Sequence, residues 1–208
     1  MEFNVTVIII LVTAAVSILS FGNGALFAKL QFNPYQAWHR REAYRLLTHG
    51  FLHADWIHLF VNMLVLYSFG SNVEYYFMQL RNAGSLDHPV AAYLLLYLGG
   101  IVIASLSTLF RYRDNYYYNS VGASGAVSAV VFTSIFFAPL DRLYLFAAIP
   151  IPGIVFAVLY LIYSSYMSRR GGDNINHDAH FAGAVFGFVF PLLIDPGLIS
   201  HFIHAFTR

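Results

Sequence analysis

Six apolar stretches, each near the length that crosses a lipid bilayer, dominate this sequence. They lie at roughly 5–28, 55–77, 90–110, 121–139, 143–165 and 178–199. A helix needs about 20 mostly apolar residues to cross the hydrocarbon core, whereas a barrel strand is about half as long and alternates in polarity. The stretches therefore predict an all-α, polytopic membrane protein with six transmembrane helices, in which residues 1–208 form a single domain.

The charge content supports a lipid environment. Hydrophobic residues make up 59% of the chain and charged residues 10%, against about 25% charged residues in a soluble globular domain. The net charge of +1 gives no basic stripe of the kind that binds nucleic acid. We expect an integral, multi-pass protein whose surroundings are the lipid bilayer, with no nucleic-acid partner.

The chain has no cysteine, which excludes disulfides, thiolate catalysis and cysteine-ligated metal. It begins without the basic segment of a cleavable signal peptide. The loop at 29–54 mixes aromatic and charged residues and is expected to fold back or lie in the membrane interface. Pro150 and Pro152 fall in the stretch 143–165 and predict a bent fifth helix, because proline removes a backbone donor.

Polar residues stand at the start of three of the apolar stretches. His58 and Asn62 are four residues apart and share one helix face. Ser124 lies among small residues in Gly-Ala-Ser-Gly, and His180 lies beside a small-residue stripe. Taken singly, each is as readily explained by packing between helices, since small residues and polar hydrogen bonds are ordinary there.

The order of the spans brings these residues together. His58 and Asn62 begin the second stretch, Ser124 begins the fourth and His180 begins the sixth. In a six-span bundle the starts of the second, fourth and sixth helices lie on the same side. The sequence thus predicts a hydroxyl, a proton acceptor and two donors at one depth, which is the minimum for acyl transfer.

Together, these residues resemble the rhomboid family of intramembrane serine proteases. The resemblance is to the bacterial type that has the six-helix core alone. Gly-Ala-Ser-Gly at 122–125 is similar to the family's nucleophile motif, and Ala-His at 179–180 to its last-helix motif. The resemblance implies that Ser124 is the nucleophile and His180 the general base. It also implies an oxyanion hole formed by His58, Asn62 and the Ser124 amide.

Further residues match supporting elements of the family. Glu42 and Arg45 resemble a Glu-x-x-Arg element that holds the first loop, and His53 precedes the His-x-x-x-Asn pattern. Gly183 and Gly187 follow the last-helix histidine and are expected to allow close helix packing.

One position departs from the family. Many bacterial relatives have a tyrosine four residues after the nucleophile, packed against the catalytic histidine, and here that residue is Ser128. His180 is therefore expected to be oriented by another aromatic or by a hydrogen bond. Asp178 is a poor third catalytic member, because residues two apart on a helix face different directions.

The resemblance implies a serine endopeptidase that needs no cofactor or metal and cleaves transmembrane segments of other proteins. Three alternatives remain open. A zinc enzyme would use His49, His53, His58 and His180, but His-Glu-x-x-His is absent. A non-catalytic member would bind membrane proteins without cutting them. A transporter would also suit buried histidines and a kinked helix.

The positive charges conflict with the orientation that the family implies. Eight basic residues lie on the side of the site and three on the other. The eight are Lys29, Arg40, Arg41, Arg45, Arg111, Arg113, Arg169 and Arg170, and the three are Arg81, Arg142 and Arg208. Charge counting alone would place the site in the cytoplasm, whereas the resemblance implies a bacterial inner membrane with the active face extracytoplasmic.

Overall fold

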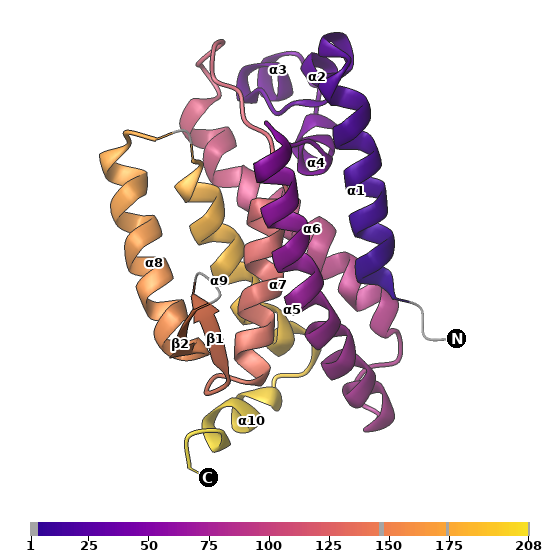
Figure 1. Cartoon of the computed structure of the whole chain (residues 1–208), viewed down its shortest axis with the longest axis vertical. Coiled ribbons are helices and arrows are strands. Elements are labelled where there is room, and N and C mark those ends of the chain that lie inside the picture. The colour runs from indigo at the N-terminus through magenta and orange to yellow at the C-terminus, as the bar shows by residue number, and fades with distance from the viewer. Residues whose placement is uncertain (1–3, 146–147, 174, 208) are drawn as a thin grey trace.

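A computed structural model describes residues 4–145, 148–173 and 175–207 (Figure 1). Six long helices form a bundle, and short helices and a hairpin join them. The long helices are α1 (Val5–Phe21), α5 (Trp56–Asn82), α6 (Pro89–Tyr112), α7 (Ser124–Phe137), α8 (Gly153–Arg170) and α9 (His177–Ile194). The shorter elements are α2 (Gly24–Leu30), α3 (Pro34–His39), α4 (Arg45–Thr48), a 3₁₀ turn at His49–Phe51, β1 (Arg142–Leu145), β2 (Ile149–Pro152) and α10 (Leu198–His204).

Three helices in the described part of the chain, α5, α6 and α9, are long and apolar enough to cross a membrane by length and composition. The other long helices are shorter or less apolar, and α1 and α8 stand at opposite edges of the bundle in Figure 1. The predicted all-α polytopic membrane fold is thus confirmed.

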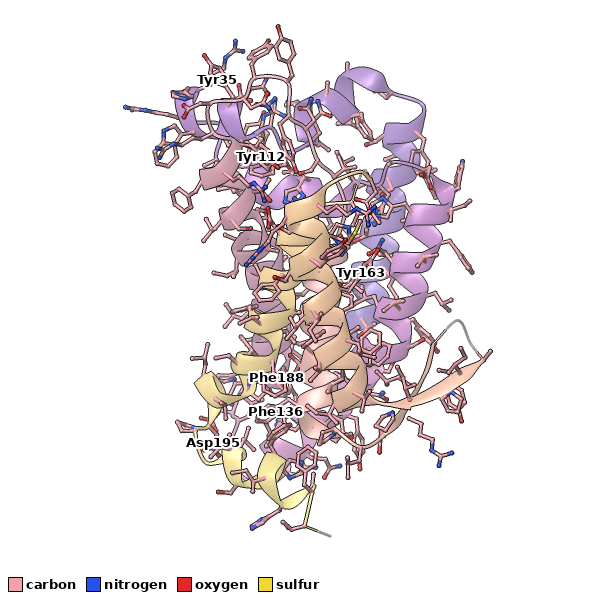
Figure 2. The ribbon with its side chains drawn as sticks, turned by 90° about the vertical axis from the view of Figure 1, so that its left-hand side faces the viewer. Tyr35, Tyr112, Phe136, Tyr163, Phe188 and Asp195 are labelled. Atoms are coloured by element: carbon pink, nitrogen blue, oxygen red, sulfur yellow. The ribbon has the colours of Figure 1, made fainter. Side chains whose placement is uncertain are left out.

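Helix α7 is the centre of the bundle. Every residue from Gly125 to Phe137 is buried, as expected for a helix that is apolar on all faces. It packs against α9, α6 and α5. Towards its end, Phe136 meets Phe188 of α9 edge to face with ring centroids 5.5 Å apart (Figure 2).

The length of α7 sets the depth of its first residue. Its 14 residues rise about 1.5 Å each, so the helix is about 21 Å long. The hydrocarbon core is about 30 Å thick. A helix this short, surrounded by longer ones, places its N-terminal Ser124 within the bundle rather than at its surface.

Two glycines let α9 approach α7 closely. A Cβ at Gly183 would overlap the carbonyl group of Gly125, and one at Gly187 would overlap the carbonyl group of Ala129. Thr133 of α7 donates a hydrogen bond to the Gly187 carbonyl at 2.7 Å. The two helices therefore meet backbone to backbone, as small-residue stripes allow in membrane proteins.

The prediction of a bent fifth helix is wrong. Pro150 and Pro152 lie in β2, which pairs with β1 in an antiparallel hairpin, and α8 begins only at Gly153. Proline fits such a short two-stranded edge because an unpaired edge position needs no N–H donor. The part of the predicted helix at 146–147 lies outside the described residues.

Two other predicted boundaries also need correction. The first helix ends at Phe21, not near residue 28, because Asn23 caps a separate helix, α2, by accepting from the Leu26 amide. The last helix ends at Ile194, not at residue 199, and the chain resumes as α10 after Pro196. Helices usually end before a proline, which restricts the residue preceding it.

Candidate active site

The structure brings Ser124 and His180 into direct contact. Ser124 is the first residue of α7 and His180 lies in the first turn of α9. The distance from Ser124 Oγ to His180 Nε2 is 2.7 Å. If the hydroxyl donates, Nε2 is the unprotonated nitrogen and Nδ1 carries the ring proton. This is the arrangement in which an imidazole can take a proton from a hydroxyl.

The turn before the serine depends on Gly122. Its φ of 125° lies in the region that glycine adopts without strain. A Cβ there would come within 2.8 Å of His58 Cε1 and 3.8 Å of Ser124 Oγ. The missing side chain thus lets the His58 ring lie next to the backbone that carries Ser124.

His58 has a ring nitrogen free to face the site. Its Nδ1 accepts from the Ala54 amide at 3.4 Å, which leaves the proton on Nε2. Asp55 caps the same helix end by accepting from the His58 amide at 2.8 Å. The cap and the Nδ1 contact together leave Nε2–H beside Gly122.

The ring of His53 packs against the ring of His58. The two rings pack edge to face with centroids 4.9 Å apart. His53 is fully buried, and its Nδ1 lies 3.0 Å from Ser17 Oγ, which in turn donates to the Phe51 carbonyl at 2.9 Å. Burial lowers the pKa of His53 to about 3, so its ring stays neutral.

Asn62 lies one turn below His58 on α5. Its Nδ2 donates to the His58 carbonyl at 2.9 Å, which uses one of its two N–H groups. No hydrogen bond joins the described Asn62 and Ser124 side chains. The second N–H of Asn62 is therefore its available donor.

A small polar cavity lies beside the serine. It has a volume of about 20 Å³, enough for one water molecule, and His49, Ser105, Ser124 and Asn176 are among its lining residues. His49 Nε2 lies 2.7 Å from Ser105 Oγ. Burial lowers the pKa of His49 to about 4 and keeps it neutral. Sequence reasoning missed Ser105 and Asn176, which reach the site from α6 and from the residue before α9.

Asp178 points away from the Ser124–His180 pair. It pairs with Arg111 at 2.6 Å and accepts from Ser168 of α8. The carboxylate therefore ties the ends of α6, α8 and α9 together, and among the described residues it makes no hydrogen bond to His180.

An aromatic side chain does lie against His180. The ring of Tyr160, on α8, is nearly parallel to the imidazole, at 19° and with centroids 6.4 Å apart. Its hydroxyl is 2.7 Å from Ser128 Oγ. The sequence had placed Tyr160 in an apolar stretch with no sign that it would face inward.

The first loop is held by Arg45, which is buried. Its Nε donates to Glu42 Oε2 at 2.6 Å, and its Nη1 donates to the carbonyls of Ala28 and Gln31 at 2.9 and 2.8 Å. This hydrogen bond from Arg45 holds the pKa of Glu42 below its ordinary value. The pair therefore fixes the end of α2 close to α4.

The histidines do not gather as metal ligands. Within the residues described, no group of three or more His, Asp or Glu side chains could hold a metal ion. His49, His53 and His180 are each engaged with a serine hydroxyl instead.

Fold and site together define a membrane-embedded helical protein with a partly buried serine–histidine pair. A family model of the rhomboid domain matches residues 40–196. RHOMBOID-like protein 12, mitochondrial, from Arabidopsis thaliana is 31% identical over 144 residues, which are 67% of this chain and 43% of that protein. The chain belongs to the rhomboid family, and this membership supports an intramembrane, protease-like function. It spans less than half the length of the Arabidopsis relative.

Proposed function

We propose that this protein is an intramembrane serine endopeptidase that cleaves transmembrane segments of other proteins with a Ser124–His180 dyad. The observation that carries the proposal is the 2.7 Å contact between Ser124 Oγ and His180 Nε2 inside the bundle. Family membership makes peptide hydrolysis the reaction class that fits this pair.

In the proposed mechanism, His180 Nε2 takes the proton of Ser124 Oγ as the oxygen attacks the scissile carbonyl. The same proton then passes to the leaving amine, and an acyl-enzyme ester remains on Ser124. A water molecule, deprotonated by His180, hydrolyses that ester. The polar cavity beside Ser124 is large enough to hold such a water.

Three donors are proposed to stabilise the oxyanion. The Ser124 amide is one of the free N–H groups at the start of α7, where no side chain caps the helix. His58 Nε2–H lies beside Gly122, and Asn62 has one uncommitted N–H. Donors of this kind stabilise the charge that develops in the transition state.

The dyad and the side chains proposed for the oxyanion hole lie on the helices α5, α7 and α9, and a substrate must present an extended peptide to them. A transmembrane helix satisfies its backbone hydrogen bonds internally and hides its carbonyls. We therefore expect cleavage where a substrate helix unwinds easily, at helix-breaking residues, and with a small residue before the cut.

The direct test is labelling of purified, detergent-solubilised protein with a fluorophosphonate probe. Wild type should label, whereas Ser124→Ala and His180→Ala should not, and Ser124→Ala should keep the wild-type melting temperature because the exchange is small. Cleavage of a transmembrane substrate in liposomes should follow the same pattern. A folded wild type that neither labels nor cleaves would leave a non-catalytic binding role for this rhomboid.

For localisation, we propose that the protein lies in a bacterial inner membrane with the site facing the extracytoplasmic side. The excess of basic residues on that side is partly neutralised, because Arg45 pairs with Glu42, Arg111 with Asp178 and Arg113 with Asp114. Arg208 of the opposite side lies outside the described residues.

The orientation can be tested by cysteine labelling, because the chain has no cysteine of its own. Asn115→Cys lies in the exposed loop on the side of the site, and Ser85→Cys lies in the exposed loop on the other side. In intact cells, an impermeant maleimide should label only the Asn115→Cys variant. Labelling of Ser85→Cys alone would reverse the orientation.

A further inference from the structure

Among the described residues, no side chain makes a hydrogen bond to Nδ1 of the His180 imidazole. The one side-chain hydrogen bond that these residues give the ring is between Nε2 and Ser124 Oγ. The nearby Asp178 is engaged with Arg111 and Ser168. In a dyad without an acid on Nδ1, the ring must therefore be held by packing.

Two rings bound the imidazole. Tyr160 of α8 lies nearly parallel to it at 6.4 Å, and His177 meets it edge on at 5.9 Å. His177 is on the same helix as His180, so it moves with it. Tyr160 comes from another helix and is the ring that can fix His180 relative to the rest of the bundle.

Tyr160 is itself held in place by a hydrogen bond of its hydroxyl and by packing of its ring. Its hydroxyl lies 2.7 Å from Ser128 Oγ on α7. Its ring packs against Phe132 of α7 and Phe156 of α8, each with centroids 5.5 Å apart. Ser128 lies one turn after Ser124. The hydrogen bond therefore attaches the tyrosine to the same helix that carries the nucleophile.

We propose that Tyr160, fixed by its hydrogen bond to Ser128, positions the His180 imidazole for proton transfer from Ser124. Tyr160 is a positioning residue, because it acts through His180 and does not touch the reacting atoms. The inference rests on the proposed dyad function. It assigns a role in that function to α8, the outer helix that packs mainly against α9.

The role separates into two testable parts. The flat ring limits rotation of the imidazole. The hydroxyl holds the ring at a fixed position relative to α7 through its hydrogen bond to Ser128. Tyr160→Phe keeps the ring and loses the hydroxyl, whereas Tyr160→Leu keeps much of the bulk and loses the flat face. Ser128→Ala removes the partner of the hydroxyl and leaves the ring in place.

The experiment measures kcat and KM on a transmembrane substrate in liposomes, and the rate of fluorophosphonate labelling in detergent. The small probe does not require a docked substrate helix, so its rate reports the dyad itself. All rates are normalised to the folded fraction. Tyr166→Ala is the matched control, because Tyr166 lies on the same helix, is exposed, and contacts Arg170 rather than the dyad.

Because a misplacement of about 1 Å can cost about 10²-fold in rate, we expect Tyr160→Leu to lower kcat and the labelling rate about 10- to 100-fold. KM should stay within about twofold of wild type, because Tyr160 does not bind substrate in this scheme. Tyr160→Phe and Ser128→Ala should lose less than about tenfold, and Tyr166→Ala should match wild type.

Each result bears on a defined claim. If wild type is active and both Tyr160→Leu and Tyr160→Phe react as fast as wild type, the positioning role is overturned and the dyad stays intact. A loss confined to KM, with normal labelling, would also overturn it and assign Tyr160 to substrate binding. A wild type that neither labels nor cleaves would overturn the dyad, and the positioning role with it. If Tyr160→Leu fails to fold, Tyr160→Met serves as the second flexible, ring-free variant.

Discussion

Replacing Gly183 by alanine should damage both the stability and the activity of this protein. Its ideal Cβ would lie inside van der Waals contact with the carbonyl oxygen of Gly125, 2.8 Å from the carbonyl carbon and 3.1 Å from the Cα of the same residue. These obstacles are backbone atoms of a buried helix. No change of side-chain rotamer can relieve them, so α9 must move away from α7.

The size of the effect follows from the overlap. Restoring ordinary contact requires the helices to separate by more than about 1 Å. Overpacking of this kind costs about 1–3 kcal/mol, and a backbone-to-backbone clash belongs at the upper end. The better helix propensity of alanine returns about 0.5–1 kcal/mol. We expect a net loss of about 2 kcal/mol in the free energy of unfolding.

Activity should fall further than stability alone explains. Ser124 directly precedes Gly125, and His180 lies three residues before Gly183, so the separation acts on the 2.7 Å Ser124–His180 contact. A shift of about 1 Å in a reacting pair can cost about 10²-fold in rate. The rate of fluorophosphonate labelling, normalised to the folded fraction, should fall by that order.

The assay pairs labelling with unfolding in mixed detergent micelles. The control is Gly99→Ala in α6, where the added Cβ meets only the tip of the Phe186 ring at 3.2 Å. This variant should keep stability within about 1 kcal/mol of wild type. If Gly183→Ala proves as stable and as reactive as Gly99→Ala, the close approach of α7 and α9 is not needed for the dyad.

Three further predictions concern polar contacts around the site. Asn62→Ala should lower the cleavage rate about 10²-fold without abolishing it, since the loss of one oxyanion donor typically costs about 10²–10³; an unchanged kcat would remove Asn62 from the oxyanion hole. Because Arg45 lowers the pKa of Glu42, the pair stabilises the fold above the ordinary carboxyl pKa, and this advantage is lost as pH falls through the lowered pKa. Melting temperatures of wild type and Glu42→Gln should thus converge as the pH falls below the ordinary carboxyl pKa of 4.5, and a constant difference would contradict the pairing. Arg111→Ala should destabilise by less than about 1 kcal/mol, because its pair with Asp178 is half exposed, and the loss should shrink at high salt.

Much of the helical framework could be predicted because it depends on local apolar content. The existence and the starts of α5, α6 and α9 follow from stretches long enough to span lipid. The wrong predictions concern places where proline or a capping residue, and not apolar content, determines the secondary structure. Pro150 and Pro152 read as a kink but form a hairpin strand, and Asn23 starts a new helix inside an apolar run. Hydropathy does not distinguish an apolar hairpin from an apolar helix.

The candidate site was predictable to the extent that it depends on chain order. The starts of even-numbered spans share one side, which places Ser124 and His180 at the same level, and the structure brings them to 2.7 Å. Tyr160 was not predictable, because the chain has 15 tyrosines and sequence alone does not show which one turns inward. Asn176 was missed for a similar reason: its partner, Thr108, is 68 residues away.

The two sides of the dyad are supported in physically different ways, and this predicts two kinds of defect. On the α7–α9 side, Gly183 and Gly187 let backbones touch, and a backbone contact fixes the distance between Ser124 and His180. On the α8 side, the link is the side chain of Tyr160, which does not set the spacing of the two helix backbones and is proposed to restrict the rotation of the imidazole. Glycine variants should therefore lose stability and activity together, because helix packing carries both. Tyr160 variants should lose more activity than their change in unfolding explains, because they leave the backbone contact of α7 and α9 in place and remove the ring beside the imidazole. A Tyr160 variant that behaved like Gly183→Ala in both measurements would show that α8 belongs to the same rigid unit as α7 and α9.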